Sequence, residues 1–101
     1  PGSISQLMAT YPRYYLLKEK FDCPAELAFK VVTELRRRYQ RENISTLDGL
    51  KIIWGEAWVH LRPSNTEPII RIIAEARSAE KARRLLEKFK DEIKQILSQV
   101  S

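Results

Sequence analysis

A polar segment at residues 62–68, Arg-Pro-Ser-Asn-Thr-Glu-Pro, concentrates side chains that are well suited to bind an anion. Arg62 carries a planar fork of N–H donors that matches the oxygens of a phosphate group. Ser64 and Thr66 add hydroxyl donors, and Asn65 adds an amide donor. These residue types in so short a stretch predict a site for a phosphate monoester.

The backbone of the same segment also favours a binding loop. Pro63 and Pro68 restrict the chain around them. The N–H groups of residues 64–66 are not needed for pairing in a sheet, so we expect them to form an anion-binding concavity. Arg71, on the strand that follows, can add a second guanidinium. Glu67 is expected to point away from the anion and to accept hydrogen bonds from backbone donors.

A simpler interpretation of residues 62–68 stays open on composition alone. Ser, Asn, Thr and Pro are ordinary turn residues, and their side chains often bond the local backbone. In that case the segment would only connect two strands.

The hydrophobic pattern predicts the elements that must position this loop. Alternating or continuous apolar residues indicate strands at residues 14–21, 44–47, 50–54, 57–61 and 69–76.

Helix signals surround these strands. One helix is predicted to begin with Asp22 or Cys23 at its N-cap and to run to about Gln40, and another to begin after Ser78. Asp48-Gly49 predicts a tight two-residue hairpin turn. The last strand is apolar on both faces for part of its length, which favours a central place in the sheet.

The order of strand, helix, three or four strands and helix is typical of an α+β fold. We expect a mainly antiparallel sheet of about four to five strands with two helices packed on one face. Residues 1–13 are interpreted as a lead-in or linker from a preceding domain, and residues 14–101 as one domain, which suits a chain of 101 residues.

Composition narrows the function classes. The hydrophobic fraction of 44% argues against disorder, and no apolar run approaches the ~18 residues of a membrane span. Cys23 is the single cysteine, so we expect neither a disulfide framework nor a cysteine metal site, and a cytoplasmic location.

The net charge of +5 suggests an anionic partner. A small basic nucleic-acid-binding module is therefore the alternative function, with the cluster Arg36-Arg37-Arg38 and Arg41 as its candidate surface. The same cluster lies near the C-terminal end of the first predicted helix, where cations are favourable without any ligand.

Residues 62–76, Arg-Pro-Ser-Asn-Thr-Glu-Pro-Ile-Ile-Arg-Ile-Ile-Ala-Glu-Ala, resemble the C-terminal signature of the α-D-phosphohexomutases. That signature is Arg-x-Ser-(Gly or Asn)-Thr-x-Pro, followed by a hydrophobic strand that ends in Glu-(Ala or Gly). The stretch from Pro12 to Tyr15, the Asp48-Gly49 turn and the final amphipathic helix are also similar to that domain. The resemblance therefore covers most of the chain.

The resemblance implies a fold similar to one repeat of the TATA-binding protein and a role as the last of four domains. In such enzymes this domain binds the phosphate of a hexose phosphate, such as glucose 1-phosphate, mannose 1-phosphate or a glucosamine phosphate. By similarity, Arg62, Ser64, Asn65 and Thr66 would hold the phosphate, and Arg71 would join them as in some branches.

The implied reaction moves phosphate between the 1- and 6-positions of the hexose through a bisphosphorylated intermediate. The chain contains neither a Ser-centred phosphoryl-transfer motif nor an Asp-x-Asp-x-Asp metal loop, which belong to earlier domains in the family. We therefore expect no catalytic residue and no cofactor in this domain, no activity of this chain alone, and Mg²⁺ in the full-length enzyme. The expected partners are the preceding domains and the substrate, without nucleic acid or membrane.

Overall fold

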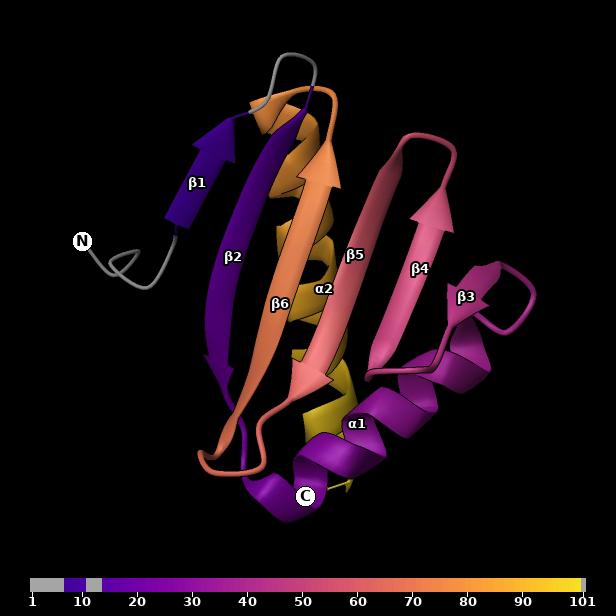
Figure 1. Ribbon diagram of the computed structural model, residues 1–101. Coiled ribbons are helices and arrows are strands. Elements are labelled where there is room, and N and C mark those ends of the chain that lie inside the picture. The colour runs from indigo at the N-terminus through magenta and orange to yellow at the C-terminus, as the bar shows by residue number, and fades with distance from the viewer. Residues whose placement is uncertain (1–6, 11–13, 101) are drawn as a thin grey trace.

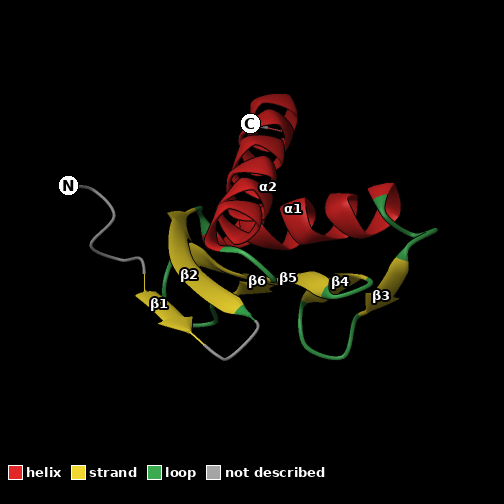
Figure 2. Cartoon of the chain, turned by 90° about the horizontal axis from the view of Figure 1, so that it is seen from above, coloured by secondary structure: helices red, strands yellow, loops and turns green. Residues whose placement is uncertain are grey.

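The computed structural model describes residues 7–10 and 14–100, which form an antiparallel sheet with two helices on one face (Figure 1). The strands are β1 (Leu7–Thr10), β2 (Tyr15–Asp22), β3 (Asn43–Ser45), β4 (Leu50–Trp54), β5 (Ala57–Pro63) and β6 (Ile69–Ala76). The helices are α1 (Ala25–Arg38) and α2 (Ala79–Val100). Figure 2 shows both helices on the same side of the sheet. The predicted α+β class and the placement of the helices are confirmed.

The strand order is β1-β2-β6-β5-β4-β3, and every neighbouring pair is antiparallel. The sheet thus has six strands, where the sequence predicted about four to five. The additional strand is β1, which lies inside the predicted lead-in of residues 1–13 and pairs Leu7 with Lys18 and Thr10 with Tyr15. β1 is a four-residue strand at the edge of the sheet and forms by pairing with the free edge of β2. Its residues show no alternation of polar and apolar side chains that would predict a strand. The rest of the lead-in, including Pro12 and Arg13, lies outside the described residues.

The hydrophobic core lies between the inner face of the sheet and the apolar stripes of the two helices. On β6, Ile70, Ile72, Ala74 and Ala76 are all buried, and β6 lies between β2 and β5, which confirms its predicted central place. The largest fully buried side chains come from both layers: Leu17, Val31, Leu35, Leu50, Ile52, Leu61, Ile70, Ile72, Leu86, Phe89, Ile93 and Ile96. No helix of the described residues lies on the opposite face of the sheet (Figure 2).

The starts of the two helices differ in how they are capped. Ser78 caps α2 as predicted, because its Oγ accepts the Lys81 N–H at 3.1 Å. In α1 the predicted cap is wrong: the N-cap residue is Pro24, which has no side-chain hydrogen bond. Asp22 belongs to β2 instead. The predicted cap was placed too early in the chain, because β2 extends as far as Asp22.

The β3–β4 hairpin is present, but its predicted two-residue turn is wrong. β3 ends at Ser45, so residues 46–49 form the connection, and Leu47 is 97% exposed. A type I′ turn needs positive φ at both central residues, whereas only Gly49 adopts one here, at 74°. The β4–β5 turn is tight, with Trp54 opposite Ala57 and Gly55 at a φ of 54°.

Candidate phosphate-binding site

Pairing between β5 and β6 sets the geometry of the site. Arg62 lies directly opposite Arg71, inside the strands rather than in the loop, because β5 is two residues longer than predicted. Their strand neighbours Leu61 and Ile72 are fully buried. Since side chains alternate between the faces of a strand, both arginines emerge on the face that carries no helix. Their side chains are 57% and 47% exposed, respectively.

The loop between these strands is held by its own polar groups. The Ser64 N–H donates to the Ile69 carbonyl at 3.1 Å. The Ser64 Oγ accepts the N–H groups of Thr66, at 3.2 Å, and of Glu67, at 3.1 Å. The N–H groups of Ser64 and Thr66, two of the three that were expected to contribute to an anion-binding concavity, are thus used within the loop. Among the described residues, only the Asn65 N–H of this trio is not used by the loop.

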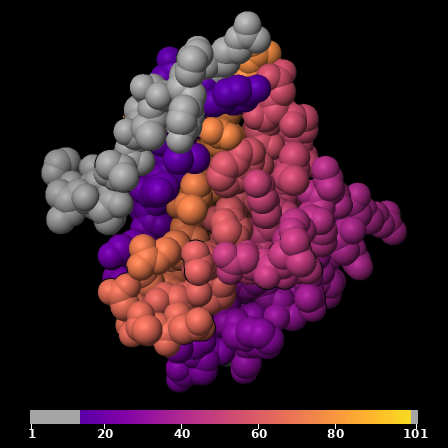
Figure 3. Space-filling view, in the orientation of Figure 1, coloured from indigo at the N-terminus to yellow at the C-terminus, as the bar shows by residue number. Residues whose placement is uncertain are grey.

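A further hydrogen bond fastens the loop to the start of α1. The Cys23 N–H donates to the Pro68 carbonyl at 2.8 Å. The loop therefore connects β5 to β6 and also rests against the junction of β2 with α1. It lies at the lower edge of the sheet in the view of Figure 3.

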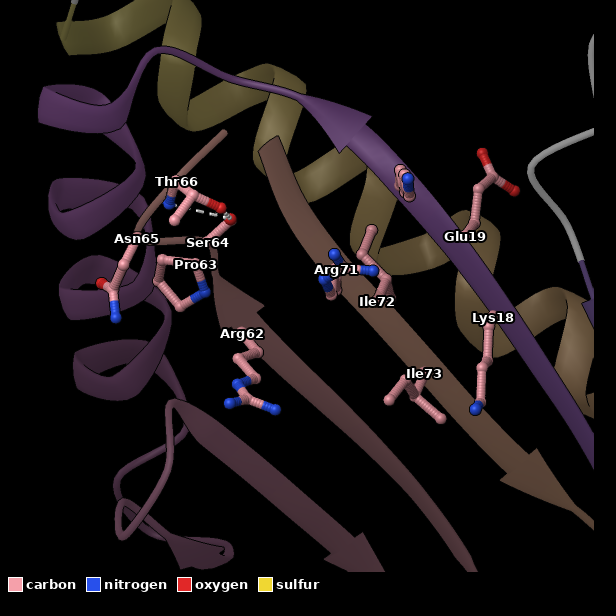
Figure 4. Close-up of a pocket in the computed structure, with 11 residues that line it drawn as sticks. Lys18, Glu19, Arg62, Pro63, Ser64, Asn65, Thr66, Arg71, Ile72 and Ile73 are labelled. Atoms are coloured by element: carbon pink, nitrogen blue, oxygen red, sulfur yellow. Dashed lines mark hydrogen bonds between the residues drawn. The ribbon is translucent and has the colours of Figure 1, made fainter. Parts of the chain in front are cut away.

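A hollow of about 660 Å³ lies beside the loop on the uncovered face of the sheet. Figure 4 shows the residues that line it, which come from the loop and from β2, β5 and β6. All five predicted site residues are among them: Arg62, Ser64, Asn65, Thr66 and Arg71. The structure thus brings together the residues that the sequence singled out.

The five residues are not all turned the same way. In Figure 4 the Asn65 side chain points away from Arg71. A second hollow of about 530 Å³ lies on that side, between the loop, α1 and the β3–β4 connection. Asn65 lines both hollows, whereas Thr66 and Arg71 line only the first. The side-chain amide of Asn65 would have to turn to meet an anion held by Arg71.

Both arginines of the site are paired with carboxylates. The Arg62 Nε lies 3.4 Å from Asp48 Oδ1, and the Arg71 Nη2 lies 3.4 Å from Glu67 Oε1. The expectation that Glu67 would serve backbone donors is therefore wrong. These are long contacts between half-exposed groups, and such pairs contribute little to stability. An incoming anion can therefore replace the carboxylates at small cost.

The β3–β4 connection packs closely against β5 beside Arg62. A Cβ atom on Gly49 would lie 2.3 Å from the Leu61 carbonyl oxygen. The backbone carbonyl of Asp48 contacts His60 Nε2. His60, the single histidine of the chain, thus has a structural role in holding this connection, and Asp48 is placed where its carboxylate reaches Arg62.

Comparison with known proteins identifies the domain. The sequence profile of the family described as phosphoglucomutase/phosphomannomutase, C-terminal domain, matches residues 17–92. The chain belongs to this family.

Curated relatives agree with this assignment. A probable phosphoglucosamine mutase from Methanopyrus kandleri is 39% identical over 99 residues, which cover 96% of this chain and 22% of the relative. A phosphoglucomutase/phosphomannomutase from Thermococcus kodakarensis is 45% identical over 85 residues, 82% of this chain and 18% of the relative. The chain spans about a fifth of the length of the curated relatives it matches.

In this phosphoglucomutase/phosphomannomutase C-terminal domain, three residues of β2 also line the first hollow and were not predicted. They are Lys18, Glu19 and Lys20. The sequence shows the two lysines only as the solvated positions of a strand, and nothing local indicates that β2 pairs with β6. Lys20 lies opposite Arg71 in that pairing, so only the register of the sheet could have revealed it.

Two of the four arginines in the basic cluster of the alternative interpretation are paired with carboxylates. Arg37 Nη2 lies 2.6 Å from Glu34, and Arg38 lies 3.2 Å from Glu34 and 3.3 Å from Glu92. The hydrogen bond from Arg37 is the main cause that lowers the pKa of Glu34 to about 2. These contacts leave less free positive charge for nucleic acid on α1.

The part of the chain that the structure describes has no group of three or more His, Cys, Asp or Glu side chains able to hold a metal ion. Within the same part of the chain, neither helix combines the length and apolar character needed to cross a membrane.

Proposed function

We propose that this domain binds the phosphate group of a hexose phosphate, as part of a phosphohexomutase that moves phosphate between the 1- and 6-positions. The observation that carries the proposal is the position of Arg62 and Arg71 on adjacent strands, lining one hollow together with Ser64 and Thr66. The names of the curated relatives, which are hexose-phosphate mutases, support it.

The proposed contacts follow from the donors available. The guanidinium groups of Arg62 and Arg71 would leave the long contacts with Asp48 and Glu67 and donate charge-assisted hydrogen bonds to the phosphate oxygens, which a guanidinium can bind with two parallel N–H groups. The Asn65 N–H and the Thr66 hydroxyl would complete the set. The Ser64 Oγ already accepts two N–H groups, so Ser64 would shape the loop and offer its remaining O–H proton.

The proposed role in the reaction is positional. A clamp on one phosphate of the intermediate would hold the non-reacting end while the other end meets the phosphoryl-transfer residues. Binding energy from such a remote group lowers the barrier by fixing the orientation of the reacting end. Because this chain contains no Ser-centred transfer motif, we expect it to bind the substrate without converting it. Mg²⁺ and the transfer residues would then belong to other domains of the enzyme.

The nucleic-acid alternative is not favoured, because Arg37 and Arg38 are held by carboxylates. The proposed site instead lies on the uncovered face of the sheet, beside the loop of residues 62–68.

Binding of glucose 1-phosphate and of unphosphorylated glucose, measured side by side by ligand-observed NMR, tests the proposal. We expect the chain to bind the phosphate ester and not the free sugar. Equal binding of the two ligands, or of neither, would contradict a phosphate clamp.

A further inference from the structure

We propose that Lys18 and Lys20 on β2 belong to the phosphate site. The two lysines provide its uncompensated positive charge, because both arginines of the site are paired with carboxylates. This inference rests on the proposed function and adds two binding residues from a strand outside the sequence signature.

The first argument is position. In the antiparallel pairing of β2 with β6, Lys20 lies opposite Arg71, and Arg71 in turn lies opposite Arg62 on β5. Three cations therefore form one row across three adjacent strands, and neighbouring strands are about 4.8 Å apart. Lys18 is two residues along β2, on the same face, and both lysines line the hollow beside the loop. In Figure 4, Lys18 on β2 and Arg62 on β5 lie on the two sides of β6.

The second argument is charge. Arg62 is paired with Asp48 and Arg71 with Glu67, each at 3.4 Å.

Glu19 is held by Lys90 of α2 at 2.6 Å, so its carboxylate is already compensated. Within the described ranges, no carboxylate forms an ion pair with Lys18 or Lys20, and both side chains are exposed. The uncompensated positive charge of the hollow is therefore that of the two lysines, which matches a phosphate monoester dianion.

The third argument is the unfavourable arrangement of the row itself. Like charges directly opposite each other on neighbouring strands destabilise a sheet. Here a lysine and two arginines occupy such positions in succession. A phosphate dianion above Arg71 would offset part of the repulsion that remains along this row, so binding gives a reason for an arrangement that folding stability does not favour.

Titration of the 101-residue chain with inorganic phosphate tests the inference, with the amide signals of residues 64–66 as the readout. The test variant is Lys18→Gln/Lys20→Gln. Its matched control is Lys81→Gln/Lys94→Gln, which removes the same charge from exposed positions of α2. Because all four side chains are exposed, the variants should keep the fold, which the dispersion of the amide spectrum will verify.

We expect the Lys18→Gln/Lys20→Gln variant to raise the Kd for phosphate about fivefold or more, because two nearby charges are lost. The α2 control should change the Kd by less than about twofold, since its charges are distant and screened. Equal Kd values for the two double variants would overturn the inference and leave the proposed function intact, provided that Arg62→Ala still abolishes binding. Absence of any loop shift in the wild-type chain would overturn both.

Discussion

Arg62 and Arg71 lie directly opposite each other on β5 and β6, on the face of the sheet that no helix covers. Two guanidinium groups in this relationship repel each other, and the chain offsets the repulsion with Asp48 and Glu67. Both carboxylates are about half-exposed and their contacts are long, so a phosphate group can take their place. In the proposed function, this pair of arginines is the centre of the site, and a phosphate group would exchange with the two carboxylates.

Replacing Arg62 with alanine should weaken phosphate binding by about 10- to 100-fold, because a hydrogen bond to a charged group contributes about 1.5–3 kcal/mol. Stability should change little, since the Arg62 side chain is 57% exposed. Calorimetric or NMR titration with glucose 1-phosphate will measure the loss. Arg37→Ala, which removes an arginine from α1, is the control and should bind as the wild type does. A comparable loss in both variants would point to a general effect of charge.

Replacing Glu67 with glutamine should tighten phosphate binding, because Arg71 no longer has a carboxylate partner within the loop. The gain should be a few-fold, in keeping with the ~0–1 kcal/mol typical of an exposed pair. Glu80→Gln is the control, since it breaks an ion pair of the same i,i+4 spacing on α2, with Arg84. If Glu67→Gln instead weakened binding, Glu67 would have to be regarded as a residue that positions Arg71.

Gly49→Ala should destabilise the domain more than Gly55→Ala. Both glycines have positive φ, at 74° and 54°, and a side chain in that conformation costs about 1–2 kcal/mol. At Gly49 the new Cβ would also lie 2.3 Å from the Leu61 carbonyl oxygen, whereas at Gly55 nothing lies within 4 Å. Overpacking of this kind adds about 1–3 kcal/mol.

Urea unfolding of the two glycine variants, with the m value as a check on two-state behaviour, will measure the difference. Equal losses of stability at Gly49 and Gly55 would show that the β3–β4 connection does not pack on β5 as described. Because that connection carries Asp48, the Gly49 variant should also alter the surroundings of Arg62.

The ion pairs of Glu34 should make a pH-dependent contribution to stability. Folding lowers the pKa of Glu34 from 4.5 to about 2, mainly through the hydrogen bond from Arg37. At pH values above the pKa of Glu34 in the unfolded state, its ionised carboxylate therefore stabilises the folded state. This contribution to stability is lost as the pH falls from 4.5 towards 2. In urea unfolding, Glu34→Gln should be less stable than the wild type near neutral pH and equal to it near pH 2. A difference that persists unchanged at the acidic end would refute this assignment.

The sequence predicted those parts of the fold whose signal is local. The alternation in β6 and the apolar stripes of α1 and α2 follow directly from burial of one face. The loop residues Arg62 to Thr66 could be singled out as candidates because their hydrogen-bond donors are contained in one short segment, while their composition alone was equally consistent with a simple turn. Ser78 was identifiable as a cap for the same reason.

Features that depend on register were not predictable from local patterns. Lys18 and Lys20 look like ordinary solvated positions until β2 is paired with β6. The pairing of Glu67 with Arg71 and of Asp48 with Arg62 depends on how the two loops fold back on the strands. The edge strand β1 and the four-residue β3–β4 connection are likewise decided by tertiary contacts.

The most direct test of the central claim is an amide NMR titration of the chain with glucose 1-phosphate, run in parallel with a short DNA duplex. We predict that the sugar phosphate shifts the amides of residues 62–71 and that Arg62→Ala abolishes these shifts. If the sugar phosphate shifted none of the loop amides and DNA shifted many amides of residues 36–41, the result would contradict the phosphate-clamp function and favour a nucleic-acid-binding domain.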